Sequence, residues 1–283
     1  MRVLHTIAEV RAARAGLTDV GLVPTMGYLH EGHLSLVTRA KAECDRVAAS
    51  IFVNPTQFGP AEDLGRYPRD LPRDLGLLEA AGCDLVFVPE PGEMYPPGFD
   101  TQILVGGVTD VLEGAVRPGH FAGVATVVAK LFNIVQPTRA YFGQKDAQQS
   151  IVIRKLVRDL DLPVDVVVAP TVRAPDGLAL SSRNSYLTAQ ERAIAPTIYR
   201  ALLEGRRLFD AGERDAEVLR RAIRLAIERE PALSIDYISV ADLLDLRELD
   251  TVGRGALASL AVRLGATRLI DNLVLGELEA ARA

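Results

Sequence analysis

The sequence of 283 residues contains little cysteine, and its two cysteines, Cys44 and Cys83, stand far apart. Their spacing matches neither a metal-binding motif nor a redox pair, so sequence gives no support to either kind of site. Isolated cysteines of this kind are typical of the reduced cytoplasm, and we expect the protein to work there.

Long hydrophobic runs and an excess of positive charge are also missing. No stretch reaches ~18 uninterrupted apolar residues, and the N-terminus lacks a charged start followed by an apolar run, which argues against a membrane span or a signal peptide. The net charge is -5, whereas a general nucleic-acid surface needs a basic face. We therefore expect a soluble protein that binds neither membranes nor nucleic acids.

Up to Pro170, short apolar runs alternate with longer helical patterns. This alternation predicts an α/β fold in which a Rossmann-like, doubly wound parallel sheet is covered by helices on both faces. Such sheets bind ligands beyond the carboxyl ends of their strands, where polar loops at residues 24–27, 54–59 and 143–146 are expected. The expected strands are 20–23, 47–53, 85–88, 139–142 and 164–168, and the expected helices are 34–44, 73–81, 124–135 and 147–160.

After Pro170 the pattern changes to that of a smaller α+β domain. A capping box at residues 188–191 predicts one long helix that continues to about residue 211, and a second helix is expected over 216–230. Strand-like runs follow at 235–240, 257–264 and 268–275. We divide the chain into domains 1–171 and 172–283, and expect the active site between them with the second domain as a lid, because domain junctions favour ligand sites.

Residues 20–33 carry the strongest functional signal. They predict a buried strand, a tight glycine turn and a helix whose first turn holds His30 and His33, two of only four histidines. A helix N-terminus offers unpaired N–H groups and partial positive charge, which suit a phosphate, and both rings would project toward it. Gly27 and Gly32 would let the backbone approach closely. The segment predicts a nucleotide site in which the histidines donate to phosphate oxygens.

Two other interpretations of this pair stay open. Zinc-binding histidines on a helix are usually spaced i, i+4, whereas His30 and His33 are spaced i, i+3 and no third ligand is evident. Alternatively, both are ordinary polar residues at the start of a helix.

Further candidates follow later strands. Lys145 and Asp146 suit phosphate and either Mg²⁺ or a ribose hydroxyl, although a solvated turn is an equally ordinary explanation. Residues 181–183, Ser-Ser-Arg, would close over a triphosphate or simply form a polar loop. Arg117 and His120 stand in a glycine-rich loop and are candidates for contacts near the phosphates, although a purely structural loop is nearly as ordinary an explanation.

Neutral amides suggest a second substrate. Asn54, Gln57 and Gln149 suit recognition of hydroxyl groups or a carboxylate, because an amide both donates and accepts hydrogen bonds. Taken singly, each is more often a surface amide. Asp70 and Asp74 would aid Mg²⁺ binding, with a solvated acidic face as the default alternative.

In this order, the motifs resemble those of the pantoate–β-alanine ligase family, within the nucleotidyltransferase superfamily. The resemblance covers nearly the whole chain and implies a two-step reaction. The carboxylate of pantoate attacks the α-phosphate of ATP to give pantoyl adenylate and pyrophosphate, and the amine of β-alanine then displaces AMP to give pantothenate. The matching segments are residues 24–33, 52–59, 67–70, 117–121, 142–146 and 180–184.

The resemblance also implies roles for individual residues. Gln57 and Gln149 would bind pantoate, with Asn54 close by; Mg²⁺ would arrive on the ATP phosphates, and the protein would form a homodimer. The implied ATP-binding residues are Met26, Gly27, Tyr28, Leu29, His30, Glu31, Gly32, His33, Gly143, Gln144, Lys145, Asp146, Val172, Leu180, Ser181, Ser182 and Arg183. The implied catalytic residues are His30, His33, Lys145, Ser182 and Arg183.

A neutral histidine donates only one ring hydrogen, so we expect His30 and His33 to stabilise the transition state electrostatically. Two rival functions stay open. One is a nucleotidyltransferase with another acceptor, although the amides favour a small hydroxy acid over a phosphorylated acceptor. The other is a nucleotide-sensing module, which would need no second substrate pocket.

Overall fold

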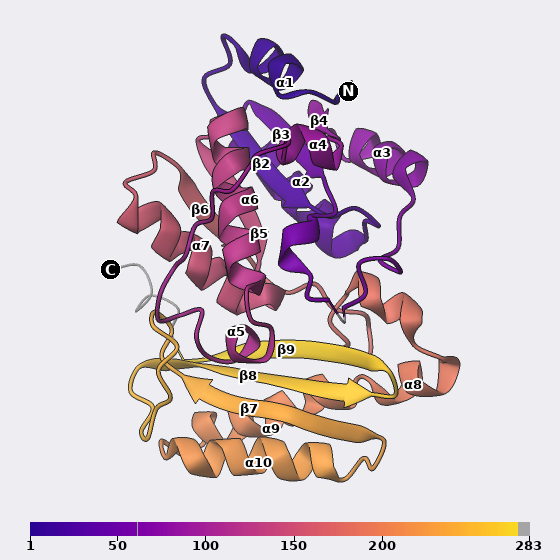
Figure 1. Ribbon diagram of the computed structural model, residues 1–283. Helices are drawn as coiled ribbons and strands as arrows, with labels where there is room; N and C mark the ends of the chain where they lie inside the picture. Colours follow the sequence, from indigo (N-terminus) through magenta and orange to yellow (C-terminus); the bar gives the residue numbers. More distant parts are fainter. Residues whose placement is uncertain (61, 277–283) are drawn as a thin grey trace. The chain divides into compact units, whose positions relative to one another are not determined.

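The computed structural model describes residues 1–60 and 62–276 (Figure 1). The chain folds as two compact units: the first comprises Met1–Gln144 and Val152–Pro170, and the second comprises Lys145–Ile151 and the chain from Thr171 onward. The domain boundary proposed from the sequence, between residues 171 and 172, stays a prediction, and residues 277–283 of its second domain lie outside the described part.

The first unit is built on a six-stranded parallel sheet with the strand order β1-β4-β3-β2-β5-β6. From β2 the chain winds outward to β3 and β4, then returns to the other side of β2 with β5 and β6. The sheet is therefore doubly wound, as expected, and its order reverses between β2 and β5. The strands are β1 (Arg2–Leu4), β2 (Val20–Thr25), β3 (Arg46–Ile51), β4 (Leu85–Phe87), β5 (Arg139–Gly143) and β6 (Asp165–Ala169).

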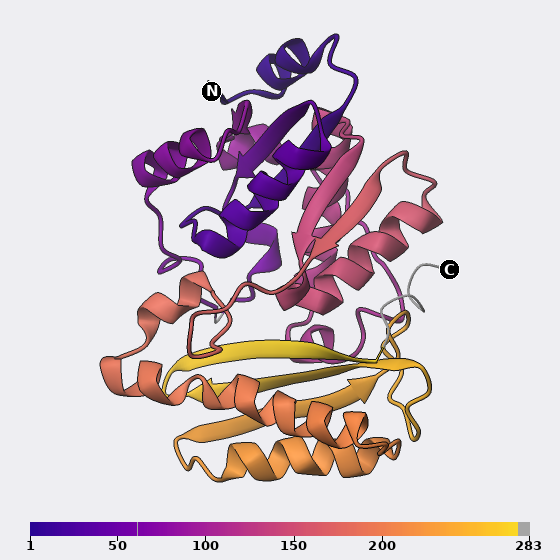
Figure 2. The ribbon, with the colours of Figure 1, turned by 180° about the vertical axis from the view of Figure 1, so that it is seen from behind.

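Helices cover both faces of this sheet. Figure 1 shows α6 in front of the strands, and Figure 2, seen from behind, shows α2 over the opposite face. The apolar face of α2 buries Leu36, Val37 and Ala40 against the sheet, which is why the helix docks there. The helices up to β6 are α1 (Ile7–Arg14), α2 (Glu31–Glu43), α3 (Leu71–Ala80), α4 (Pro91–Met94), α5 (Glu113–Val116), α6 (His120–Val135) and α7 (Ala147–Asp159).

The second unit is an antiparallel sheet of three strands, in the order β7-β8-β9, packed on helices. Ile198, Leu202 and Ile223 of the helices share a core with Val240 and Leu260 of the sheet. This α+β unit agrees with the predicted fold class. Its elements are α8 (Ala189–Ile194), α9 (Thr197–Asp210), α10 (Ala216–Glu228), β7 (Leu233–Ala241), β8 (Gly255–Leu264) and β9 (Thr267–Gly276).

One expected helix is wrong. Thr188 and Glu191 form the predicted capping box, but the helix ends at Ile194 and a separate helix starts at Thr197. Pro196 stands between them and has no N–H to continue the hydrogen-bond ladder, so the predicted single helix is broken there.

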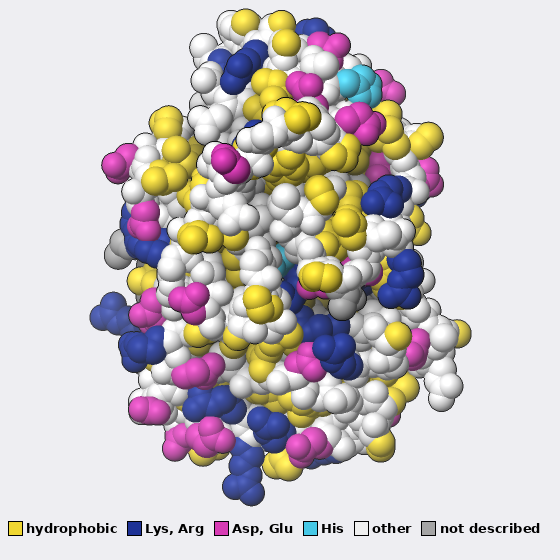
Figure 3. All heavy atoms as spheres, viewed as in Figure 1, with side chains coloured by type: hydrophobic (Ala, Val, Ile, Leu, Met, Phe, Trp, Pro, Cys, Tyr) yellow, Lys and Arg dark blue, Asp and Glu magenta, His cyan; other side chains and the backbone are white. Residues whose placement is uncertain are grey.

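On the second unit, acidic and basic side chains stand side by side, as Figure 3 shows for one face. This unit also carries exposed ion pairs on α9, such as Arg206–Asp210 and Arg207–Glu204. Within the described residues, no helix has the length and apolarity that a membrane crossing requires.

Candidate active site

The predicted motifs of the first unit meet at one edge of its sheet. β3, β2 and β5 are neighbours and run parallel, so their carboxyl ends lie along the same edge. The strand order reverses between β2 and β5, and this topological switch point is where doubly wound sheets bind ligands. β2 leads into the turn that precedes His30, β3 leads to the short 3-10 helix η1 (Pro55–Gln57), and β5 leads to Gln144.

The two histidines cap the start of α2. The Nδ1 atom of His30 accepts the N–H of Gly32 at 3.1 Å, and the Nδ1 atom of His33 accepts the N–H of His30 at 3.3 Å. The ring centroids are 4.0 Å apart. Since Nδ1 accepts in both rings, each neutral ring carries its hydrogen on Nε2, a tautomer assigned from these bonds. Both histidines can therefore donate through Nε2.

This arrangement corrects the expectation of unpaired N–H groups at the helix start. His30 is the residue before the first helical turn. Its ring accepts the N–H of Gly32, and its carbonyl accepts the N–H of His33 at 2.8 Å. His30 thus acts as Asn or Asp does at other helix starts.

Asp74 lies beneath the turn that leads to these histidines. Its side chain is only 1 % exposed, and its carboxylate accepts the N–H of Tyr28 at 2.6 Å and that of Leu29 at 2.7 Å. Burial raises the pKa of Asp74 above its ordinary value, although the two backbone hydrogen bonds oppose this shift. The default expectation of a solvated acidic face is therefore wrong for Asp74.

The structure gives Gly27 a reason of its own, beside the expected approach to phosphates, which stays a prediction. Its φ is +81°, and a Cβ built there would lie 3.0 Å from both Asp74 Oδ2 and Ile51 Cγ2. The close approach of Asp74, together with the left-handed backbone, requires glycine at this position.

The amides of the second motif form a buried network. The Nδ2 of Asn54 donates to Gln57 Oε1 at 3.1 Å and to the carbonyl of Gly123 at 3.2 Å. Its Oδ1 accepts from the hydroxyls of Tyr95 at 2.7 Å and Thr56 at 2.9 Å. Asn54 thus holds Gln57 in place, while its own contact with substrate stays a prediction.

Gln57 connects the first two motifs. Its Nε2 lies 3.2 Å from the sulfur of Met26, in the turn after β2. Gly123 of α6 lies against the other side of η1, where a Cβ would come within 2.5 Å of the carbonyl oxygen of Thr56. Nothing in the local sequence pattern indicated Gly123 or Tyr95 as supports of this loop.

Arg117 and His120 lie against the loop that carries Gln57. Arg117 makes two 2.6 Å bonds to the carboxylate of Glu62, and its Nη1 lies 3.0 Å from His120 Nε2. Arginine only donates, so His120 accepts at Nε2 and donates from Nδ1 to the carbonyl of Gln57 at 2.8 Å. Both residues therefore support the amide loop, and their expected position near the phosphates stays a prediction.

Electrostatics in this network agree with the hydrogen bonds. Burial and the neighbouring charge of Arg117 lower the pKa of His120 to about 4, so the ring is neutral at pH 7. Burial disfavours the charged form of Glu62, but the bonds and charge of Arg117 outweigh it and the pKa of Glu62 lies below its ordinary value.

The remaining candidates belong to the second unit. The carbonyl of Lys145 accepts from Asn272 Nδ2 on β9 at 2.8 Å, and its Nζ lies 3.5 Å from Asp146 Oδ1. The N–H of Leu180 donates to the carbonyl of Val172 at 3.0 Å. Asn272 was not anticipated, because no local motif marks it.

The other predicted site residues of the second unit lie around η3 and on α7. Ser181 precedes the 3-10 helix η3 (Ser182–Tyr186) and its hydroxyl accepts the N–H of Arg183 at 3.3 Å. Ser182 is buried, and Gln149 lies on α7. Their predicted roles in ATP and pantoate binding stay predictions.

The metal hypothesis finds no cluster of ligands. Among the residues that the structure describes, no group of three or more His, Cys, Asp and Glu side chains is placed to hold a metal ion. Cys44 and Cys83 are buried free thiols.

The chain is an α/β protein with a doubly wound parallel sheet. Imidazole and amide side chains follow the strands at the edge where such sheets bind ligands, beside the switch point between β2 and β5. Residues 2–274 match the family model of pantoate-beta-alanine ligase. Pantothenate synthetase of Roseiflexus sp. (strain RS-1) is 66% identical over 276 residues, covering 97% of this chain and 99% of that protein. The corresponding protein of Chloroflexus aurantiacus (strain ATCC 29366 / DSM 635 / J-10-fl) is 64% identical, covering 97% and 98%.

Solved structures agree. Pantothenate synthetase from Thermus thermophilus has a TM-score of 0.93 and 54% identity, covering 96% of this chain and 99% of that one. Pantoate-beta-alanine ligase from Francisella tularensis, complexed with beta-gamma ATP and beta-alanine, has a TM-score of 0.79 and 36% identity, covering 97% of each chain. This chain belongs to the pantoate–β-alanine ligase family, which confirms the resemblance and the prediction of a ligase of pantothenate biosynthesis.

Proposed function

We propose that this protein condenses pantoate with β-alanine in two steps, of which the first consumes ATP and forms an enzyme-bound pantoyl adenylate. Family membership over residues 2–274 supports the overall reaction, and the Francisella tularensis relative is described as complexed with beta-gamma ATP and beta-alanine. The observation that carries the mechanism is the pair of imidazoles at the switch point, each with Nδ1 accepting a backbone N–H.

In the first step, a carboxylate oxygen of pantoate attacks the α-phosphorus of ATP, and the bond to the departing pyrophosphate breaks. Negative charge builds on the phosphate oxygens in the transition state. His30 and His33 donate through Nε2–H to these oxygens and stabilise that charge without giving up a proton. In the second step, the amine of β-alanine attacks the acyl carbon, AMP leaves, and the amine loses a proton as the amide forms.

Gln57 is suited to orient pantoate in the first step. Its amide is held by Asn54 on one side, and its backbone carbonyl is held by His120 on the other. A side chain fixed in this way loses little conformational freedom when it binds a hydroxy acid.

The second unit would supply the charged contacts to the nucleotide. Lys145, Ser182 and Arg183 would neutralise phosphate charge, as the family resemblance implies. Mg²⁺ would be held by the ATP phosphates themselves, since both oxygens of Asp74 accept backbone N–H groups and no acidic cluster is found in the described part of the chain. A homodimer in the cytoplasm completes this proposal.

The decisive assay follows pyrophosphate. With pantoate and MgATP alone, we expect pyrophosphate release and pantoate-dependent exchange of labelled pyrophosphate into ATP, and AMP should accumulate when β-alanine is added. Pyrophosphate release that requires a different acceptor would favour another nucleotidyltransferase. ATP binding without any pyrophosphate would favour the sensing module.

The proposed role of the histidines predicts the effect of His33→Ala. Loss of one transition-state donor should lower kcat for pyrophosphate release by roughly 10²-fold. The control is His5→Ala, since His5 is exposed and lies outside the site. Equal rates for the two variants would remove His33 from the mechanism.

A further inference from the structure

The turn between β2 and α2 has an unusual backbone. Gly27 and Tyr28 both have positive φ, +81° and +49°. The N–H groups of Tyr28 and Leu29 then point to the same side, where both meet the carboxylate of Asp74. Successive N–H groups arranged in this way form an anion-binding concavity. In this protein the carboxylate of Asp74 occupies the concavity.

The neighbouring residue of α3 holds the other side of the turn. Arg73 Nη1 donates to the carbonyl of Leu29 at 3.0 Å, and its guanidinium carbon lies 5.6 Å from the centre of the Tyr28 ring. The same Nη1 lies 3.7 Å from Asp74 Oδ1. Both backbone polar groups of Leu29, the residue directly before His30, are therefore bound by the start of α3.

We propose that Asp74 is a positioning residue for catalysis, which fixes the backbone turn of Gly27–Leu29 and thereby sets the directions of the His30 and His33 rings. It touches no reacting atom, and its effect passes through the turn. The kinetic part of this inference rests on the proposed function of the two histidines.

The chemistry of the contact requires a carboxylate. Each oxygen of Asp74 accepts one N–H group, so the turn needs two acceptors in one buried side chain. In Asp74→Asn one oxygen is replaced by NH₂, whose hydrogens would face a backbone N–H. The turn must then shift or leave one N–H without a partner, and in either case the direction of His30 changes.

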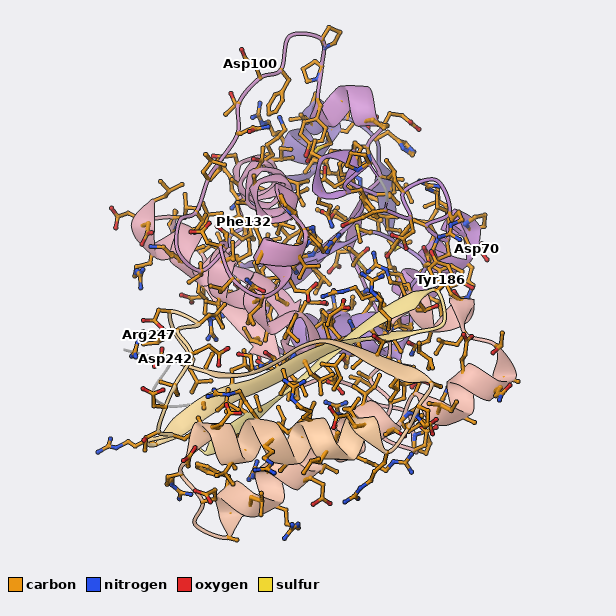
Figure 4. All side chains as sticks on the ribbon, turned by 60° about the horizontal axis from the view of Figure 1, so that its bottom comes forward. Asp70, Asp100, Phe132, Tyr186, Asp242 and Arg247 are labelled. Carbon is orange, nitrogen blue, oxygen red and sulfur yellow. The ribbon has the colours of Figure 1, made fainter. Side chains whose placement is uncertain are left out.

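The matched control lies four residues earlier. Asp70 is a carboxylate at the start of the same helix (Figure 4); it is partly exposed, and among the described residues its carboxylate accepts one N–H, that of Arg73 at 3.2 Å. Asparagine caps a helix about as well as aspartate, so Asp70→Asn should leave the helix and the turn unchanged.

The test combines kinetics with ¹⁵N-histidine NMR of the ligand-free protein. The chain has only four histidines, and His5 and His120 serve as internal references for His30 and His33. We expect the wild-type protein to show the Nε2–H tautomer for His30 and His33. In Asp74→Asn this pattern should give way to a tautomer mixture, and kcat for pantoate-dependent pyrophosphate release should fall by about 10- to 100-fold. Asp70→Asn should match the wild type in both measurements.

A lower melting temperature of Asp74→Asn with unchanged kcat and unchanged histidine signals would overturn the proposal, because Asp74 would then be only structural. If this variant does not fold, Arg73→Met provides the second test. It removes the bond to the Leu29 carbonyl from a half-exposed position, and unchanged His30 and His33 signals in that variant would equally overturn the proposal. Absence of pyrophosphate with the wild-type protein would refute the proposed function alone, since the NMR measurement needs no substrate.

Discussion

Gly123→Ala tests how closely α6 must approach the loop that carries Gln57. A Cβ at this position would lie 2.5 Å from the carbonyl oxygen of Thr56 and 2.7 Å from the backbone nitrogen of Gln57. Neither atom belongs to a side chain that can rotate away. Since ordinary contacts begin near about 3.5 Å, α6 or η1 would have to move by about 1 Å.

The expected energy combines two opposing effects. Alanine is favoured over glycine inside a helix by roughly 0.5–1 kcal/mol, whereas overpacking costs about 1–3 kcal/mol. Because the contacts of Gly123 are with backbone, we expect the upper part of that range and a net loss of about 1–2 kcal/mol. This corresponds to a decrease in Tm of about 2–8 °C.

The same displacement should alter pantoate binding. It moves the backbone of Gln57 and weakens the 3.2 Å bond from Asn54 to the carbonyl of Gly123. Misplacement of a binding group by about 1 Å can reduce catalytic efficiency by up to roughly 10²-fold, so we expect the KM for pantoate to rise by about 10-fold. Calorimetric melting and steady-state kinetics with varied pantoate measure the two effects.

Gly76→Ala is the control for this substitution. Gly76 lies in α3, and a Cβ there would meet no atom within 4 Å. The helix preference of alanine should then act alone and stabilise the protein by about 0.5–1 kcal/mol, with unchanged kinetics. If Gly123→Ala proves as stable as Gly76→Ala and keeps its KM, the inferred close packing of α6 on η1 is wrong.

Two further predictions concern buried charge. The pKa of His120 falls from 6.5 to about 4 on folding, so the neutral ring contributes stability above pH 6.5 that is lost as the pH decreases toward 4, on the order of 3 kcal/mol. Urea unfolding across this pH range should show the loss of stability, and His120→Gln should remove this pH dependence. If the free energy of unfolding of the variant depends on pH as steeply as that of the wild type, the assignment to His120 is wrong. In the second unit, Asp271 is 3 % exposed and pairs with Arg173 at 2.6 and 2.9 Å, so Asp271→Asn should destabilise that unit by about 3–5 kcal/mol in thermal unfolding. The control is Glu204→Gln, which removes an exposed pair and should change stability by less than about 1 kcal/mol. Equal losses of stability in the two variants would contradict the assigned importance of the buried pair.

Patterns that depend on near neighbours were predicted well. The buried apolar run from Val20 and a helix with His33 in its first turn were anticipated, because these patterns depend on residues a few positions apart, whereas His30 proves to be the residue that caps this helix. β1 was missed, since it has only three residues and its partner is β4, whose Leu85 pairs with Arg2. Such pairing across the chain leaves no local pattern.

The supports of the site were less accessible to sequence reasoning. Arg117 and His120 were named as candidate phosphate contacts on their residue types, whereas their contacts with Glu62 and the carbonyl of Gln57 were not anticipated. These partners are 55 and 63 residues away in sequence. The connections between strands decide which loops meet, and the local spacing of polar residues carries no information about that choice.

By itself, the sequence determined that a buried strand ends in a glycine turn before a helix with two histidines, since propensities, spacing and caps act over a few residues. It also determined the family, through motifs spread over nearly the whole chain. Only the tertiary structure decided which groups satisfy the N–H groups of that turn, which ring nitrogen of each histidine accepts, and that His120 is neutral. Those properties depend on burial and on partners such as Asp74, which is 46 residues from Tyr28 and is brought there by the packing of α3.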